Sequence, residues 1–146
     1  MKTVIGQLSD FIEETEKGLK NLWIQDDKMQ VYVRKGYHLL SGKASTTLDI
    51  ATVEVYDEYR NKGLWTEFLK SAIELNPWSA VYVENVHNPY LASSLIRRGW
   101  ITAGGLGVDL SFGVMSFFMP KDFGKYYDNM SLQDSINKLK NNAYNL

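Results

Sequence analysis

The segment from Val53 to Thr66 constrains the fold of this chain more than any other part of the sequence. It reads VEVYDEYRNKGLWT, so an apolar strand pattern ends, a basic turn with one glycine follows, and a helical pattern begins at once. A strand that leads directly into a helix points several unpaired amides and the positive dipole end of that helix at one place. Such a place can bind a phosphate or a pyrophosphate. An ordinary strand-to-helix turn, with glycine for its backbone angle, is the alternative interpretation.

The spacing of apolar residues predicts helices and strands along the whole chain of 146 residues. The predicted elements are a helix near 9–22, strands at 29–33, 38–40 and 46–55, a helix from 63 to 75, a strand at 79–86, a helix from 89 to 98, strands at 101–103 and 110–119, and a short helix from 131. We interpret Lys35-Gly36 as a hairpin turn, and the change of alternation at Ile50 and Ala51 as a β-bulge. We therefore expect one α/β (α+β) domain over residues 1–146, with a single mixed, mostly antiparallel sheet and helices on both faces. Residues 121–146 are expected to form a C-terminal extension that carries the last short helix.

Composition excludes several classes of protein and of site. The 16 basic and 17 acidic residues give a net charge of -1, so we expect neither a nucleic acid nor a membrane as a partner. The absence of cysteine excludes disulfides, thiolate metal ligands and a cysteine nucleophile. His38 and His87 have no neighbour at metal-ligand spacing, so no metal site is predicted. Because no apolar run approaches the roughly 20 residues of a membrane span, we expect a cytoplasmic protein.

The order of the predicted elements and two motifs resemble the GNAT family of N-acetyltransferases over most of the chain. In that family a bulged strand precedes a turn of the form Arg/Gln-x-x-Gly-x-Gly/Ala, whose amides hold the pyrophosphate of acetyl-CoA. Arg60 and Gly63 match this turn, and Asn88 with Gly99-Trp100 matches the second motif, an asparagine after the next strand and a helix that closes on Gly-Phe. The resemblance implies an acyl-CoA N-acyltransferase fold with acetyl-CoA as cosubstrate and no metal. The cofactor-binding residues that it implies are Val53, Val55, Arg60, Asn61, Lys62, Gly63, Leu64, Trp65, Thr66 and Asn88.

The resemblance also implies that an amine attacks the thioester in a V-shaped opening between the two central strands. An ammonium must first lose a proton, and a carboxylate on one of these strands is the candidate base. We prefer Glu84 to Glu54, because Glu84 lies near the carboxyl end of its strand, where ligands of α/β sheets bind. A solvated residue on the polar side of a strand is the alternative interpretation of both.

Two residues depart from the family pattern. Trp65 takes the place of the last small residue of the turn, and we expect its indole to pack against the sheet beside Phe68 and Leu69, which leaves the turn open. Leu95 stands where the family commonly has a tyrosine that protonates the departing thiolate, and a leucine has no proton to give.

Two functions therefore stay open. The first is an acetyl-CoA-dependent N-acyltransferase that moves an acetyl group to an amine acceptor, on a small molecule or on a protein. The second is a catalytically inactive relative of the same fold that serves in binding or assembly, as small bacteriophage proteins with this fold do. Self-association as a homodimer is left open for both.

Overall fold

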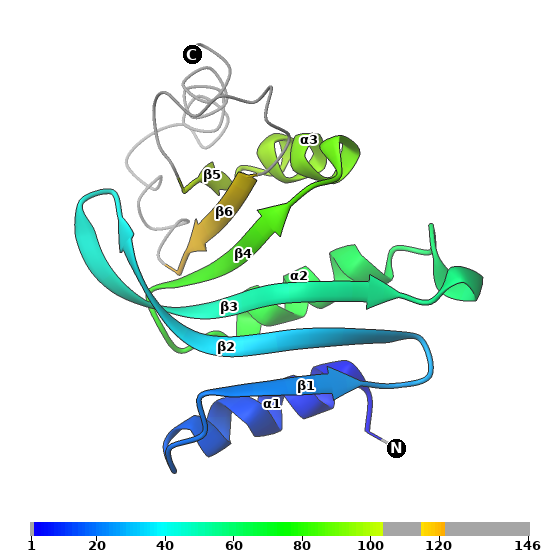
Figure 1. Ribbon diagram of the computed structural model, residues 1–146, viewed down its shortest axis with the longest axis horizontal. Helices are drawn as coiled ribbons and strands as arrows, with labels where there is room; N and C mark the ends of the chain where they lie inside the picture. The colour runs from blue at the N-terminus through cyan, green and yellow to red at the C-terminus, as the bar shows by residue number, and fades with distance from the viewer. Residues whose placement is uncertain (1, 104–114, 122–146) are drawn as a thin grey trace.

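A single sheet forms the body of the protein, which the computed structural model describes over residues 2–103 and 115–121 (Figure 1). Its six strands are β1 (Asn21–Gln25), β2 (Met29–Leu40), β3 (Lys43–Val55), β4 (Ala80–Val86), β5 (Ile101–Thr102) and β6 (Met115–Pro120). The helices are α1 (Val4–Thr15), α2 (Leu64–Leu75), α3 (Pro89–Arg97) and a 3-10 turn, η1 (Asp57–Tyr59). The strand order is β1-β2-β3-β4-β6-β5, and only β3 and β4 run parallel. The predicted fold class, one mixed and mostly antiparallel sheet with helices, is confirmed.

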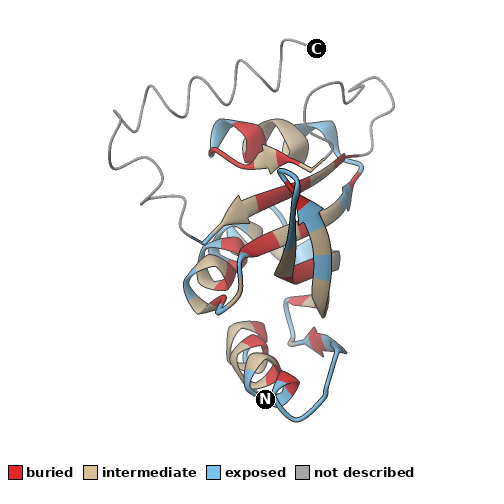
Figure 2. Ribbon diagram, turned by 90° about the vertical axis from the view of Figure 1, so that its left-hand side faces the viewer, coloured by how far each residue is buried: buried red, intermediate tan, exposed pale blue. Residues whose placement is uncertain are grey.

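The main core lies between the sheet and its helices. Helices α1 and α2 lie against the same face of the sheet (Figure 2). Alternate residues of β2, such as Val31 and Val33, are fully buried there, together with Leu8 and Phe11 of α1. Burial of these side chains is the main favourable contribution to folding, at about 1.5–3 kcal/mol each. The intervening residues of β2 point to the opposite face.

The predicted β-bulge is confirmed in β3. Tyr32 of β2 pairs with Thr52, whereas the next residue, Val33, pairs with Ile50, so Ala51 is an extra residue without a partner on β2. The extra residue reverses the alternation of the strand. Ile50 therefore points into the core before the bulge and Val53 packs against the same core after it.

The predicted helix near 9–22 is wrong in both of its boundaries. Helix α1 begins at Val4, where the Thr3 side chain accepts a hydrogen bond from the Gly6 amide at 3.2 Å, and it ends at Thr15. Gly18, with φ 101°, then turns the chain into β1. The error arose because apolar residues of an edge strand happened to extend the helical stripe, and the spacing alone does not separate the two elements.

The predicted hairpin turn at Lys35-Gly36 is also wrong, because both residues lie inside β2. The turn is Ser41-Gly42, between the paired residues Leu40 and Lys43, and its two φ values are 52° and 79°. Two consecutive left-handed residues are typical of a type I′ hairpin turn, which matches the twist of the flanking strands.

The residues predicted to begin and end the later helices do so in the structure. Helix α2 follows Gly63, which has φ 78°, and it ends before Asn76. The Asn88 side chain caps α3, and Gly99, with φ 89°, ends it. The Gly104–Gly107 segment, residues 110–114 and the extension after Lys121 with its predicted helix lie outside the described residues. Within the described part of the chain, no helix is long and apolar enough to cross a membrane.

Candidate functional site

A cleft opens where the two parallel strands part. β3 and β4 pair from Thr47 and Ala80 to Ile50 and Val83, and the ladder then stops. Beyond this point lies a cleft of about 440 Å³. Its walls are formed by Ile50, Ala51, Thr52, Val53, Trp65, Val83, Glu84, Asn85, Val86, His87, Asn88 and Leu91.

An irregularity in each strand borders the cleft. In β3 it is the bulge at Ala51. In β4 the pairing with β6 jumps between Val83 and Val86, and Asn85 takes a left-handed conformation with φ 50°. The Asn85 amide donates to Ser116 Oγ at 3.0 Å. Bulges bend a strand and redirect its side chains, and the second of them was not predicted because the sequence of β4 keeps an ordinary strand pattern.

A second hollow of about 310 Å³ lies at the turn from β3 into α2, lined in part by Arg60, Asn61 and Gly63. The first helical hydrogen bond runs from the Glu67 amide to the Gly63 carbonyl at 2.9 Å. Among the described residues, the amides of residues 61–66 have no hydrogen-bond acceptor. The left-handed conformations of Asn61 and Gly63 bend the backbone there. Such an array of free amides at a helix N-terminus favours an anion.

The cations predicted for this turn are held in different ways. Arg60 folds back on the strand, because its Nε donates to the Val55 carbonyl at 3.0 Å and its Nη1 lies 3.2 Å from Asp57 Oδ1. The Lys62 ammonium lies 5.9 Å from the centre of the Tyr59 ring. Both side chains remain exposed and can reorient toward a ligand.

Arg98 is a cation that the sequence reasoning missed as a site residue. It follows α3, yet its Nη1 donates to Thr66 Oγ1 in the first turn of α2 at 2.8 Å. A positive group beside the positive end of a helix is unfavourable without an anion nearby. The sequence placed Arg98 only at the end of its own helix, and nothing local indicated that it reaches α2.

Trp65 lines both hollows. Its ring stacks on Phe68, with 6.4 Å between centroids and 13° between planes, in agreement with the predicted packing. Its buried Nε1 has no hydrogen-bond partner among the described residues. An unpaired buried donor of this kind costs about 1–3 kcal/mol.

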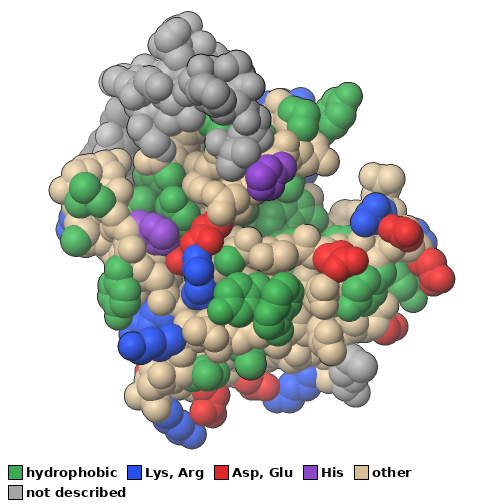
Figure 3. All heavy atoms as spheres, in the orientation of Figure 1, with side chains coloured by type: hydrophobic (Ala, Val, Ile, Leu, Met, Phe, Trp, Pro, Cys, Tyr) green, Lys and Arg blue, Asp and Glu red, His purple; other side chains and the backbone are tan. Residues whose placement is uncertain are grey.

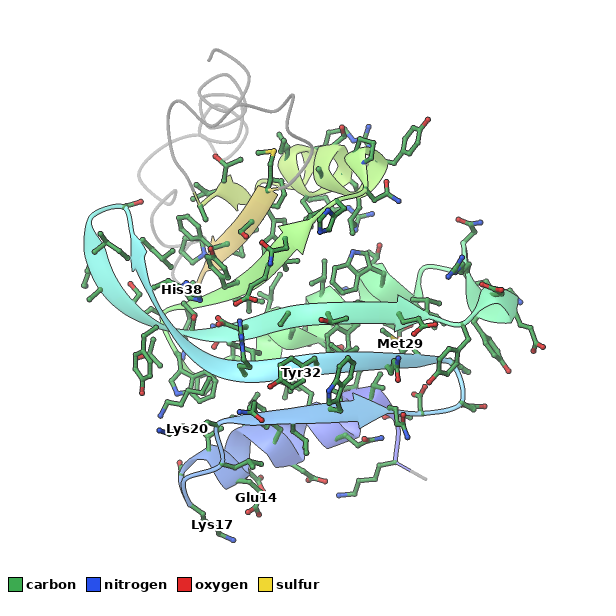
Figure 4. All side chains as sticks on the ribbon, viewed as in Figure 1. Glu14, Lys17, Lys20, Met29, Tyr32 and His38 are labelled. Atoms are coloured by element: carbon green, nitrogen blue, oxygen red, sulfur yellow. The ribbon has the colours of Figure 1, made fainter. Side chains whose placement is uncertain are left out.

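Glu84 lines the cleft and also belongs to a network of charged side chains on the face of the sheet opposite α1 and α2. Its carboxylate is mostly buried, and Oε1 accepts a hydrogen bond from the Arg34 guanidinium. Arg34 Nη2 also lies 3.9 Å from Oδ2 of Asp49. The Asp49 side chain is 3% exposed. Its carboxylate accepts a hydrogen bond from Thr47 Oγ1 at 2.6 Å and lies 2.9 Å from His38 Nε2. Figure 3 shows acidic and basic side chains gathered over the middle of this face, and Figure 4 shows His38 among the strands there.

Tyr82 completes this network on β4. Its ring stacks on His38, with 3.7 Å between centroids and 10° between planes. Burial raises the pKa of Tyr82, the negative charges of Glu84 and Asp49 act in the same direction, and a hydrogen bond with Ser116 opposes them. The phenol is therefore neutral at physiological pH.

His38, Asp49 and Glu84 bring their ligand atoms within 4.8 Å of one another, an arrangement that could hold a metal ion. They come from β2, β3 and β4, so local spacing could not indicate this cluster. The Arg34 guanidinium already lies between the two carboxylates and supplies a positive charge there. A metal would therefore have to displace an arginine.

The two candidate bases, Glu84 and Glu54, have different surroundings in the structure. Glu84 lines the cleft, whereas Glu54 is exposed and accepts a hydrogen bond from Gln30 Nε2 at 2.8 Å. Asn88 lines the cleft too, and its Oδ1 caps α3. Leu95 is 1% exposed in the core.

Neither a family model nor a curated protein matches the sequence. One similar solved structure is described as the crystal structure of KacTA-DNA complex, with a TM-score of 0.52, 12% identity and coverage of 84% of this chain and 82% of that chain. At this identity the likeness shows the fold alone. The prediction that nucleic acid is not a partner is nevertheless contradicted, because that similar chain occurs in a complex with DNA. Net charge is a weak criterion for this question, because it averages over the surface and does not exclude local groups of cations.

Proposed function

We propose that this protein is an acetyl-CoA-dependent N-acyltransferase. The observation that carries the proposal is the position of the cleft between β3 and β4 next to the hollow with the free amides of residues 61–66. A long ligand with a charged middle and an apolar arm fits such a pair of hollows, and sites of a few hundred Å³ are typical for small ligands. The resemblance in sequence names acetyl-CoA as that ligand.

In this proposal each part of the site has a separate task. The amides of the turn, with Lys62 and Arg98, bind the pyrophosphate. The cleft holds the thioester arm against Trp65 and brings the carbonyl carbon near Glu84. Glu84 accepts a proton from the acceptor's ammonium, and the neutral amine then attacks the carbonyl carbon. Because Leu95 is buried and has no proton to give, the departing thiolate takes its proton from the solvent or from the acceptor nitrogen.

Calorimetry with acetyl-CoA tests the proposal, and two glycines provide a matched pair of variants. Gly63 and Gly42 have φ values of 78° and 79°, and neither has an atom within 4 Å of an added Cβ. Valine would have a left-handed φ at both positions, so it imposes backbone strain at each of them. We expect Gly63→Val to abolish binding and Gly42→Val to retain it. Absence of heat from the native protein at millimolar acetyl-CoA would refute the proposal.

DNA binding is a second candidate, favoured by the similarity to a chain found in a complex with DNA and by three cations near one turn, Arg60, Lys62 and Arg98. Fluorescence anisotropy with a labelled duplex, at low and at physiological salt, tests it. A phosphate-binding surface predicts affinity that falls steeply with salt. If the duplex binds and acetyl-CoA does not, the function of a non-catalytic binding module replaces the enzyme.

A further inference from the structure

One oxygen of Glu84 is held by the protein and the other is not. Oε1 accepts from the Arg34 guanidinium, whereas Oε2 has no hydrogen-bond donor among the described residues. Because Glu84 lines the cleft and 15% of its side chain is exposed, a ligand there can reach the carboxylate. The contact with Arg34 therefore restricts the position of the Glu84 carboxylate at the cleft wall.

Arg34 is in turn held by Asp49, which cannot move easily. Both oxygens of Asp49 are engaged, one by Thr47 and one by His38. The carboxylate also fills the space opposite Gly36, where a Cβ would lie 1.9 Å from Oδ2. A buried carboxylate is costly unless it is paired and hydrogen-bonded. Asp49 is thus a fixed negative charge that keeps the guanidinium between two carboxylates.

We propose that Arg34 is a positioning residue of the acyl transfer: it holds one oxygen of Glu84 and directs the other to the acceptor's ammonium. This role rests on the proposed function. A primary ammonium loses two protons in the transfer. Glu84 accepts the first, the nitrogen–carbon bond then forms, and the second proton leaves the nitrogen for the thiolate as the carbon–sulfur bond breaks.

Among the described residues, Arg34 is the one side chain that holds the Glu84 carboxylate. Without Arg34 the carboxylate can turn away from the cleft, so the acceptor's ammonium is placed less precisely and the chemical step slows. Arg34 itself lines neither hollow, so its loss should leave acetyl-CoA binding in place.

The test compares Arg34→Gln with Lys35→Gln. Lys35 is the next residue of the same strand, and its ammonium lies 5.3 Å from the centre of the Trp78 ring, outside the network. Both variants remove one positive charge. The measurements are kcat and KM at one pH for the primary amine that supports the fastest release of coenzyme A. Arg34→Lys and calorimetry with acetyl-CoA complete the set.

We expect Arg34→Gln to lower kcat by about tenfold or more, because the base is no longer held in place. Lys35→Gln should leave kcat unchanged, Arg34→Lys should restore most of it, and acetyl-CoA affinity should stay within about threefold in all three variants. An unchanged kcat in Arg34→Gln would overturn the role of Arg34 while leaving the proposed function intact. If Arg34→Gln does not fold, a near-native kcat in Arg34→Lys beside an inactive Glu84→Gln supports the role, and a full rate in Glu84→Gln overturns it. A native protein that binds no acetyl-CoA overturns both proposals.

Discussion

Replacement of Gly36 by alanine is the sharpest test of the packing around the buried carboxylate. Gly36 lies inside β2 opposite Thr47, and its φ is not in the left-handed region. An added Cβ would lie 1.9 Å from Asp49 Oδ2 and 2.4 Å from its Cγ. The Asp49 carboxylate cannot move away from this Cβ without losing its contacts to Thr47 and His38.

The expected loss in the free energy of unfolding follows from these contacts. Overpacking a close-packed site costs about 1–3 kcal/mol, and removing a partner from a buried charge costs about 3–5 kcal/mol. Because Asp49 would be displaced rather than deleted, we expect Gly36→Ala to cost about 2–4 kcal/mol. Urea unfolding followed by tryptophan fluorescence measures this value.

Two controls separate the clash from other effects. Gly6 lies in α1, where a Cβ would be 3.6 Å from the nearest atom, so Gly6→Ala should stabilise the helix by up to about 1 kcal/mol. In an Asp49→Ala background, where the clashing carboxylate is absent, Gly36→Ala should cost less than about 1 kcal/mol. An equal cost of Gly36→Ala in both backgrounds would refute the reasoning, because the glycine would then serve the backbone and not Asp49.

Three further predictions concern single residues. Leu95→Tyr should destabilise the protein by about 1–3 kcal/mol without raising acetyl transfer, because the leucine is fully enclosed in the core; a stable variant with faster turnover would contradict this. Asn88→Ala should cost about 1 kcal/mol in urea unfolding, through loss of the α3 cap, and Asn88→Ser should retain most of the stability. Because burial raises the pKa of Tyr82, the folded protein keeps the phenolic proton at a pH where the unfolded chain loses it, so stability falls as pH rises above about 10. Tyr82→Phe should reduce this decline, and an unchanged slope between native and variant would count against it.

The sequence by itself determined the features that depend on neighbours along the chain. The glycine and cations at 60–63 predicted the strand-to-helix turn, and the phase change at Ile50 and Ala51 predicted the bulge. The amide of Asn88 and the glycine at position 99 marked the ends of α3. Each of these features is a local backbone requirement, and a residue within a few positions along the chain meets it. The type of that residue therefore indicates the feature without knowledge of the fold.

Tertiary structure decided the rest, because the residues concerned meet only after distant strands pair. The apolar residues of the edge strand β1 continue the spacing of the preceding helix, so the sequence predicted helix there. The pairing of β1 with β2 shows that this segment is a strand. Gly36, which resembled a turn residue, is required by a carboxylate on the neighbouring strand. His38, Asp49 and Glu84 were isolated polar residues in the sequence, and the order β2-β3-β4 brings them to one face around Arg34. Pairing between strands sets which side chains face each other, and that register is a property of the whole sheet that no local pattern contains.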